Sequence, residues 1–229
     1  MSLSAWKTWR LAAVAALVAC AIVGVAPIRA RASDSMSFHV APLDMGSCGG
    51  PCPRVIVAEG VIETDTPQHF VDFLKGVSED HTLRRIVFFN SRGGNVVASM
   101  VFGHILRELR VAGVVGRFEG GDRGPFVGEC LSACVYAMMG AVRRVAPAGS
   151  QVALHRMSIV EHETGNWGFS DHVTRSFADK PMVSILKRYA RRMGVNPRMV
   201  ALAESLPPDS MLVLTPTEMQ RWSFATGRF

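Results

Sequence analysis

Residues 86–110, IVFFNSRGGNVVASMVFGHILRELR, decide the fold class of this chain. They begin inside an apolar run rich in β-branched and aromatic residues, which predicts a short buried strand at 84–90. The turn SRGGN then leads into apolar residues spaced as on one face of a helix, at 96–110. A buried strand that runs directly into a helix is the building unit of α/β proteins. The segment therefore predicts an α/β fold.

The segments on either side continue this alternation of strand and helix. A β-rich run, RVIVAEGVI (54–62), precedes a helical pattern behind a Thr-Pro start (66–80). Further on, the sequence predicts a strand, a short apolar helix and two brief strands, in AGVVGRFEG (112–120), ECLSACVYAMMG (129–140), RRVAPAG (143–149) and QVALHR (151–156). Because these strands are too hydrophobic to face water, we expect helices to cover the sheet.

The first 32 residues have the layout of a secretory signal. Lys7 and Arg10 precede an uncharged apolar run, and small residues offer a cleavage point after Ala32. The apolar run is shorter than the ~20 residues that a helix needs to cross a bilayer. We therefore expect an exported protein. Two alternatives stay open: an uncleaved membrane anchor, and lipidation at Cys20, where LVAC (17–20) resembles a lipobox.

The rest of the chain is long enough for one domain. The sequence predicts a signal peptide (1–32), an extended Cys-containing lead-in rich in Ser, Gly and Pro (33–53) and a single domain (54–229). The net charge is +6, and removing the +4 of residues 1–32 leaves +2. That charge is too small and scattered to indicate a nucleic-acid partner. The basic cluster in ILKRYARRMG (185–194) has the spacing of the exposed face of a helix.

Residues suited to chemistry lie where predicted strands end. The Gly-Gly turn after 84–90 places backbone amides at a helix N-terminus, where they can hold an anion or a developing oxyanion. Ser132 lies near the start of the apolar helix, a place where serine also serves simply as an N-cap. The strand 151–156 delivers His155 at its end. Each feature alone is equally compatible with a structural role.

The order of these features resembles that of one protein superfamily. A strand with a Gly-Gly turn, a serine at the head of an apolar helix and a strand ending in histidine follow one another as in the Clp-type protease proteolytic subunits. The resemblance is closer to exported, periplasmic Clp-protease-like bacterial proteins with a C-x-S-A-C motif. The matching stretches are 86–110, 130–156 and, less clearly, MLVLTPTEMQRWSFAT (211–226). The resemblance implies a ClpP/crotonase-like spiral of ββα units.

The same resemblance implies a role for each residue at the strand ends. Ser132 would be the nucleophile and His155 the general base, because a serine hydroxyl needs an adjacent base to attack a carbonyl. The oxyanion would be bound by the backbone amides of Gly94 and Ala133.

A third group must hold the histidine in one tautomer, and the sequence leaves its identity open. Asp209 is the nearest acid to the family position, but one alignment places Ser210 or Met211 there instead. A Ser–His dyad is therefore an alternative. Glu204 is a weaker candidate, expected to be an exposed residue of the helix VALAES (200–205).

Four cysteines remain after the predicted signal: Cys48, Cys52, Cys130 and Cys134. In an oxidising compartment an even number favours disulfides, and the local pairs 48–52 and 130–134 are the expected connectivity. Cross-pairing and a four-thiolate zinc site are alternatives, but the spacing is not the commoner C-x₂-C. We expect no metal and no cofactor.

These observations predict an exported serine hydrolase that works as an ATP-independent peptidase on a peptide or protein substrate. No ATPase partner is expected, because ATP is not available outside the cytoplasm. The alternative is a non-catalytic binding or structural protein of the same fold. The irregular segment EHETGNWGFSDH (161–172) is expected to cover the site or to form a homo-oligomer contact.

Overall fold

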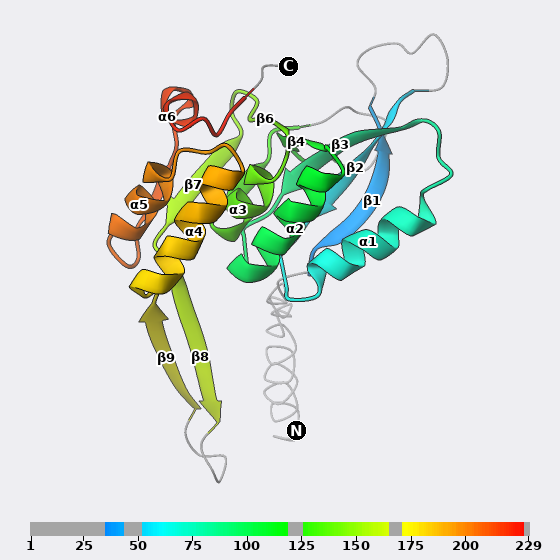
Figure 1. Ribbon diagram of the computed structural model, residues 1–229. Coiled ribbons are helices and arrows are strands. Elements are labelled where there is room, and N and C mark those ends of the chain that lie inside the picture. Colours follow the sequence, from blue (N-terminus) through cyan, green and yellow to red (C-terminus); the bar gives the residue numbers. More distant parts are fainter. Residues whose placement is uncertain (1–34, 44–51, 119–125, 165–170, 227–229) are drawn as a thin grey trace, which may run out of the picture. The chain divides into compact units, whose positions relative to one another are not determined.

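The main sheet has five strands. The computed structural model describes residues 35–43, 52–118, 126–164 and 171–226 (Figure 1). The strands lie in the order β1-β2-β3-β4-β6, with β2 to β6 parallel and β1 antiparallel at the edge. They are β1 (Ser37–Pro42), β2 (Arg54–Glu59), β3 (Leu83–Asn90), β4 (Ala112–Val115) and β6 (Arg143–Val145).

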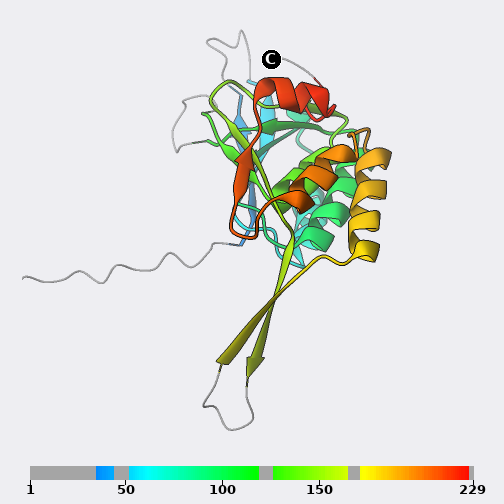
Figure 2. The ribbon, with the colours of Figure 1, turned by 90° about the vertical axis from the view of Figure 1, so that its left-hand side faces the viewer.

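A second, three-stranded sheet carries the chemically important ends. It consists of β10 (Met211–Val213), β7 (Gln151–His155) and β5 (Glu129–Leu131), in the order β10-β7-β5. A parallel bridge between Ser91 and Cys130 joins its edge to the end of β3. A separate antiparallel hairpin of β8 (Ser158–Thr164) and β9 (Asp171–Phe177) extends away from the sheets after β7 (Figures 1 and 2).

The helices lie mainly on one face of the sheets (Figure 2). They are α1 (Thr66–Gly76), α2 (Val96–Glu108), α3 (Ala133–Met139), α4 (Lys180–Arg192), α5 (Arg198–Ser205) and α6 (Pro216–Arg221). Every residue of α3 is buried, so this short helix lies at the centre of the core. The opposite face of the main sheet carries a smaller apolar cluster of Val55, Phe88, Val114 and Val145, against which Phe118 packs. The expectation that helices cover the sheets is met on the first face.

Three segments differ from their sequence-based description. The predicted helix at 129–140 begins as strand β5, because Glu129–Leu131 pairs with β7 and buries Cys130 and Leu131. Part of the segment 161–172, expected to be irregular, forms the paired ends of β8 and β9. The described part of the lead-in 33–53, which the sequence places before the domain, supplies strand β1 at the edge of the main sheet.

Arg144 is a buried cation that joins several parts of the chain. Its guanidinium donates hydrogen bonds to five backbone carbonyls, those of Met139, Ala141, Met193, Ser223 and Phe224, at 2.6 to 3.2 Å. Burial is the main cause that lowers the pKa of Arg144 to about 10, with neighbouring Arg107 as a second cause. The side chain therefore stays cationic at neutral pH and ties the ends of α3 and α4 to the chain that follows α6.

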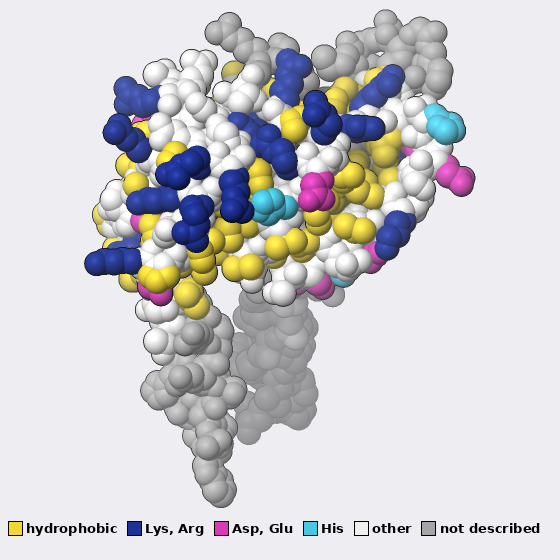
Figure 3. Space-filling model, viewed as in Figure 1, with side chains coloured by type: hydrophobic (Ala, Val, Ile, Leu, Met, Phe, Trp, Pro, Cys, Tyr) yellow, Lys and Arg dark blue, Asp and Glu magenta, His cyan; other side chains and the backbone are white. Residues whose placement is uncertain are grey.

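The basic cluster of α4 lies on the exposed side of that helix. Arg188, Arg191 and Arg192 face solvent, whereas Leu186 and Tyr189 are buried, as the sequence predicts. Figure 3 shows Lys and Arg side chains gathered over this part of the surface. Within the described ranges, no helix is both long enough and apolar enough to cross a membrane. Residues 1–32 lie outside these ranges, so the signal peptide, the anchor and lipidation at Cys20 stay predictions.

Candidate active site

Ser132 lies in a tight turn between β5 and α3. Its φ is +55°, a left-handed conformation that a non-glycine residue rarely adopts. Backbone hydrogen bonds fix the turn on both sides, from the Ser132 amide to the Ala153 carbonyl and from the Leu131 amide to the Ser91 carbonyl, both 2.9 Å. Within the described part of the chain the Ser132 side chain makes no capping hydrogen bond. The turn therefore presents the hydroxyl instead of using it as an N-cap.

His155 meets that hydroxyl from the end of β7. Its Nε2 lies 2.5 Å from Ser132 Oγ, and its Nδ1 lies 2.6 Å from the Arg156 carbonyl oxygen. Because a carbonyl only accepts hydrogen bonds, Nδ1 carries the proton, and Nε2 of the neutral ring is free to accept one from the serine. The structure thus brings together the two residues that the sequence named as nucleophile and base.

Asp209, the predicted third member, does not contact His155. Its Oδ1 lies 2.6 Å from Arg175 Nη1, and its side chain is 85% exposed. Met211 occupies the position directly opposite His155 in the pairing of β10 with β7. The prediction for Asp209 is therefore corrected. Asp209 is instead a well-solvated acid paired with a surface arginine, and the residue opposite His155 is apolar.

The Gly-Gly turn packs against Ser132. Gly93 has φ +106°, and a Cβ there would lie 2.8 Å from the Ser132 Cβ and 2.9 Å from the Ala133 amide nitrogen, so only glycine fits. The Ile62 amide donates to the Gly93 carbonyl at 2.8 Å and the Asn95 amide to the Ile62 carbonyl at 2.7 Å. Among the described residues, these bonds leave the Gly94 amide without an acceptor. The sequence pointed to Gly94 as an oxyanion donor, whereas the steric role of Gly93 becomes visible only in the fold.

Gly94, Ala133, Ser132 and His155 line one cleft of about 560 Å³. Polar and apolar surface contribute about equally to its walls. The apolar part comes from residues that the sequence did not indicate, namely Val96, Val97, Tyr136, Met157, Ile159 and Met182. Burial raises the pKa of Tyr136, which stays neutral. A cleft that combines apolar surface with convergent polar groups can bind an organic substrate.

The cysteines on either side of Ser132 are joined. Cys130 and Cys134 form a disulfide with a Cα–Cα distance of 5.2 Å, and both are fully buried. This confirms the predicted local pair and removes both thiols from the alternative zinc site. Cys52 is also disulfide-bonded, and Cys48 lies outside the described residues, so the pair 48–52 stays a prediction. The described residues contain no group of three or more His, Cys, Asp or Glu that could hold a metal.

Comparison with known proteins identifies the fold. No protein family model matches the chain, and no curated protein matches it in sequence. A mutant of the 1510-N membrane-bound stomatin-specific protease matches with a TM-score of 0.50 at 14% identity, over 74% of this chain and 75% of the protease. A second mutant of that protease, in complex with a substrate peptide, matches with a TM-score of 0.49 at 15% identity, over 76% of this chain and 73% of the protease. A ClpP1 mutant from Listeria monocytogenes matches with a TM-score of 0.44 at 13% identity, over 76% of this chain and 90% of ClpP1.

Together with the strand and helix order described above, the first of these matches shows that the domain has the ClpP/crotonase-like α/β fold that the sequence predicted.

Proposed function

We propose that this protein is an exported serine hydrolase that acts as an ATP-independent peptidase. The observation that carries the proposal is the 2.5 Å contact between Ser132 Oγ and His155 Nε2 at one cleft. A serine paired with a histidine whose other nitrogen is already engaged is the arrangement needed to activate a hydroxyl. The amides of Gly94 and Ala133, which line the same cleft, support an oxyanion site beside it.

In this mechanism His155 acts as the base. Its Nε2 takes the Ser132 proton while Oγ attacks the carbonyl carbon of a peptide bond, and the Arg156 carbonyl stabilises the imidazolium that forms. The tetrahedral oxyanion accepts hydrogen bonds from the Gly94 and Ala133 amides. His155 then gives its proton to the leaving amine, and a water molecule, deprotonated by the same nitrogen, hydrolyses the acyl-enzyme.

The cleft favours an extended, unfolded substrate. Val97 and Ile159 are about half exposed in the wall of the cleft, at 50% and 43%. They offer contact area to apolar side chains of a peptide, whereas a folded protein would have to release a segment first. We therefore propose short or unfolded peptides as substrates.

The proposed compartment is the periplasm, with the signal cleaved after Ala32. The buried Cys130–Cys134 disulfide supports an oxidising environment. No ATPase partner is proposed, because ATP is absent there. Retention of the N-terminal segment as an anchor and lipidation at Cys20 are the alternatives, and mass spectrometry of the exported protein distinguishes all three.

The test is labelling of the folded, oxidised protein with a fluorophosphonate, which forms a covalent bond with an activated serine. We expect labelling of the natural protein, none in Ser132→Ala and almost none in His155→Ala. Ser158→Ala is the matched control, because this serine lines the same cleft but is not the partner of His155. Absence of Ser132-dependent labelling would leave the second candidate, a non-catalytic binding protein of this fold.

A further inference from the structure

One peptide group connects the proposed base to a carboxylate. The carbonyl oxygen of Arg156 accepts the hydrogen bond from His155 Nδ1 at 2.6 Å. The N–H of the same peptide group, which belongs to Met157, donates to Oε1 of Glu204 at 3.3 Å. Ser132, His155, this peptide group and Glu204 therefore form one continuous chain of hydrogen bonds.

We propose that Glu204 is the positioning residue that replaces the triad acid and acts on His155 through the Arg156–Met157 peptide group. The inference rests on the proposed function. A carboxylate that accepts from a peptide N–H polarises the group and makes its carbonyl oxygen a stronger acceptor. That carbonyl then fixes the tautomer of His155 and stabilises its imidazolium, which are the two tasks of a triad acid.

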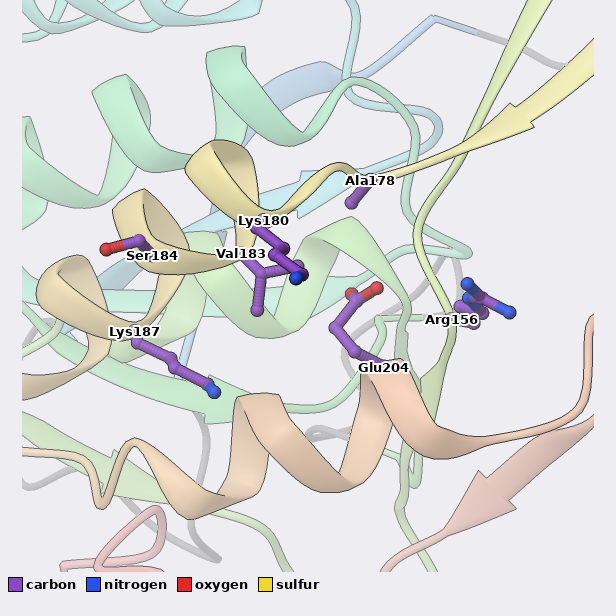
Figure 4. Close-up of a pocket in the computed structure, with 7 residues that line it drawn as sticks. All are labelled: Arg156, Ala178, Lys180, Val183, Ser184, Lys187 and Glu204. Carbon is purple, nitrogen blue, oxygen red and sulfur yellow. The ribbon is translucent and has the colours of Figure 1, made fainter.

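The surroundings of Glu204 suit an ionised carboxylate inside the protein. Glu204 extends from α5 into a hollow of about 390 Å³ between α4 and the chain after β7. Figure 4 shows its carboxylate directed into this hollow, with Lys180 and Lys187 of α4 on one side and Arg156 on the other. Such cations favour the anion electrostatically.

The charge of Glu204 is also opposed by its partial burial. Desolvation is the largest effect and raises the pKa of Glu204, while the Met157 hydrogen bond and the charges of Arg156, His155 and Lys187 lower it. Tyr136 of α3 is neutral, because burial raises its pKa and the charge of Glu204 raises it further. Protonation of Glu204 would weaken the chain of hydrogen bonds at its acidic end.

The other candidate acid, Asp209, lies elsewhere. Asp209 is paired with Arg175, and Met211 fills the position opposite His155. Among the hydrogen bonds of the described residues, Glu204 is the carboxylate that belongs to this chain of groups.

The experiment compares Glu204→Gln with Glu204→Ala. Glutamine keeps an oxygen that can accept from the Met157 amide but removes the charge, whereas alanine removes both. The second-order rate of fluorophosphonate labelling is measured from pH 5 to 9. We expect Glu204→Gln to slow labelling about tenfold at neutral pH, far less than the roughly 10⁴-fold effect of altering an acid in direct contact with the histidine.

The pH dependence separates an electrostatic role from a structural one. Because the imidazolium loses its anionic neighbour, the acidic limb of the profile in Glu204→Gln should move to lower pH. Glu108→Gln, the same change on an exposed helix position, is the control and should leave rate and profile unchanged. If Glu204→Gln equals the natural protein at every pH while Glu204→Ala is slow, Glu204 only holds the segment and the proposal is wrong.

A readout without turnover keeps this inference separate from the proposed function. In NMR titrations of the His155 ring, Glu204→Gln should lower the midpoint relative to the natural protein. An unchanged midpoint overturns the inference even if Ser132 is labelled. If the midpoint falls but Ser132 is never labelled, the link between Glu204 and His155 stands and the hydrolase proposal fails. Circular dichroism melting confirms that each variant is folded.

Discussion

The two halves of the candidate site are built in different ways. Ser132 lies in a turn that is enclosed by buried residues, crosslinked by Cys130–Cys134 and pressed against Gly93. His155 lies at the end of a strand, half-buried, and its ring is held by the peptide group that follows it. The proposed nucleophile is thus positioned by covalent and steric constraints, and the proposed base by hydrogen bonds and charge.

The two halves should therefore control different properties of the site. Changes around Ser132 should act through geometry and therefore at all pH values. Changes around His155 should act through charge and therefore alter the pH dependence as well as the rate.

The largest effect is expected for His155→Ala. Without a base the Ser132 hydroxyl is a poor nucleophile, and the labelling rate should fall by about 10⁴-fold or more. The double variant with Ser132→Ala should be no worse than Ser132→Ala alone, because the two residues act as one unit. Labelling rates and peptide cleavage measure both. A loss of less than tenfold would show that His155 is not the base.

Gly93→Ala tests whether close packing against Gly93 positions Ser132. A Cβ at this position meets the Ser132 Cβ and the Ala133 amide within 3 Å, and φ of +106° strains any other residue. We expect about a 100-fold loss of labelling, the size seen when an oxyanion donor is displaced. Gly76→Ala is the control, since a Cβ there meets no described atom within 4 Å. A Gly93→Ala protein with normal rates would contradict the steric role.

Met211→Asp tests whether the surroundings of His155 lack an acid in direct contact with its ring. Cross-strand partners have their Cβ atoms about 5 Å apart, so a carboxylate at 211 can reach the ring of His155. We expect the labelling rate to rise roughly tenfold, because the added carboxylate stabilises the imidazolium that forms during the reaction. Met211→Asn supplies the matched polar control. Equal rates in the two variants would mean that the carbonyl and Glu204 already suffice.

Removal of the disulfide should affect stability more than rate. Cys130→Ala/Cys134→Ala opens a loop with a sequence separation of 4, which corresponds to about 2 kcal/mol of unfolding free energy. Urea denaturation measures this loss. The Ala133 amide should also be held less firmly, so labelling should slow by a few-fold at every pH. Unchanged labelling would show that the disulfide does not position the turn.

The smallest effect is the pH dependence of stability contributed by Glu204. Its folded-state pKa is raised above the ordinary value of 4.5, so the folded protein binds more protons than the unfolded chain between the two values. The contribution of Glu204 is thus fully present below pH 4.5 and is lost as pH rises through the raised pKa. The difference in unfolding free energy between the natural protein and Glu204→Gln should fall over that interval. An increase would contradict the assigned direction.

The fold and the contact between Ser132 and His155 could be predicted because their signals are local. The strand, Gly-Gly turn and helix at 86–110 form from neighbouring residues, and Ser132 and His155 each lie at the end of such a unit. Strand β5 was missed because three residues pair with β7 only through the tertiary fold, which overrides an apolar helical pattern.

The support of His155 could not be predicted from its own segment. Asp209 is the acid nearest in sequence to the family position, but its carboxylate pairs with Arg175, at a sequence separation of 34, and not with His155. Glu204 reaches His155 through a backbone group contributed by a different element, and a backbone group leaves no signature in the sequence. Only the packing of α5 against the end of β7 reveals this connection.

Arg144 should influence how the domain unfolds. Its guanidinium takes carbonyls from the end of α3, from the end of α4 and from the chain after α6. If the segment after α6 unfolded alone, the buried Arg144 guanidinium would lose its hydrogen bonds to the Ser223 and Phe224 carbonyls. A buried cation without those partners is strongly destabilising. Partial unfolding from this end is therefore disfavoured. The terminal segment and the central helix should lose structure together, in one cooperative transition that native-state hydrogen exchange can detect.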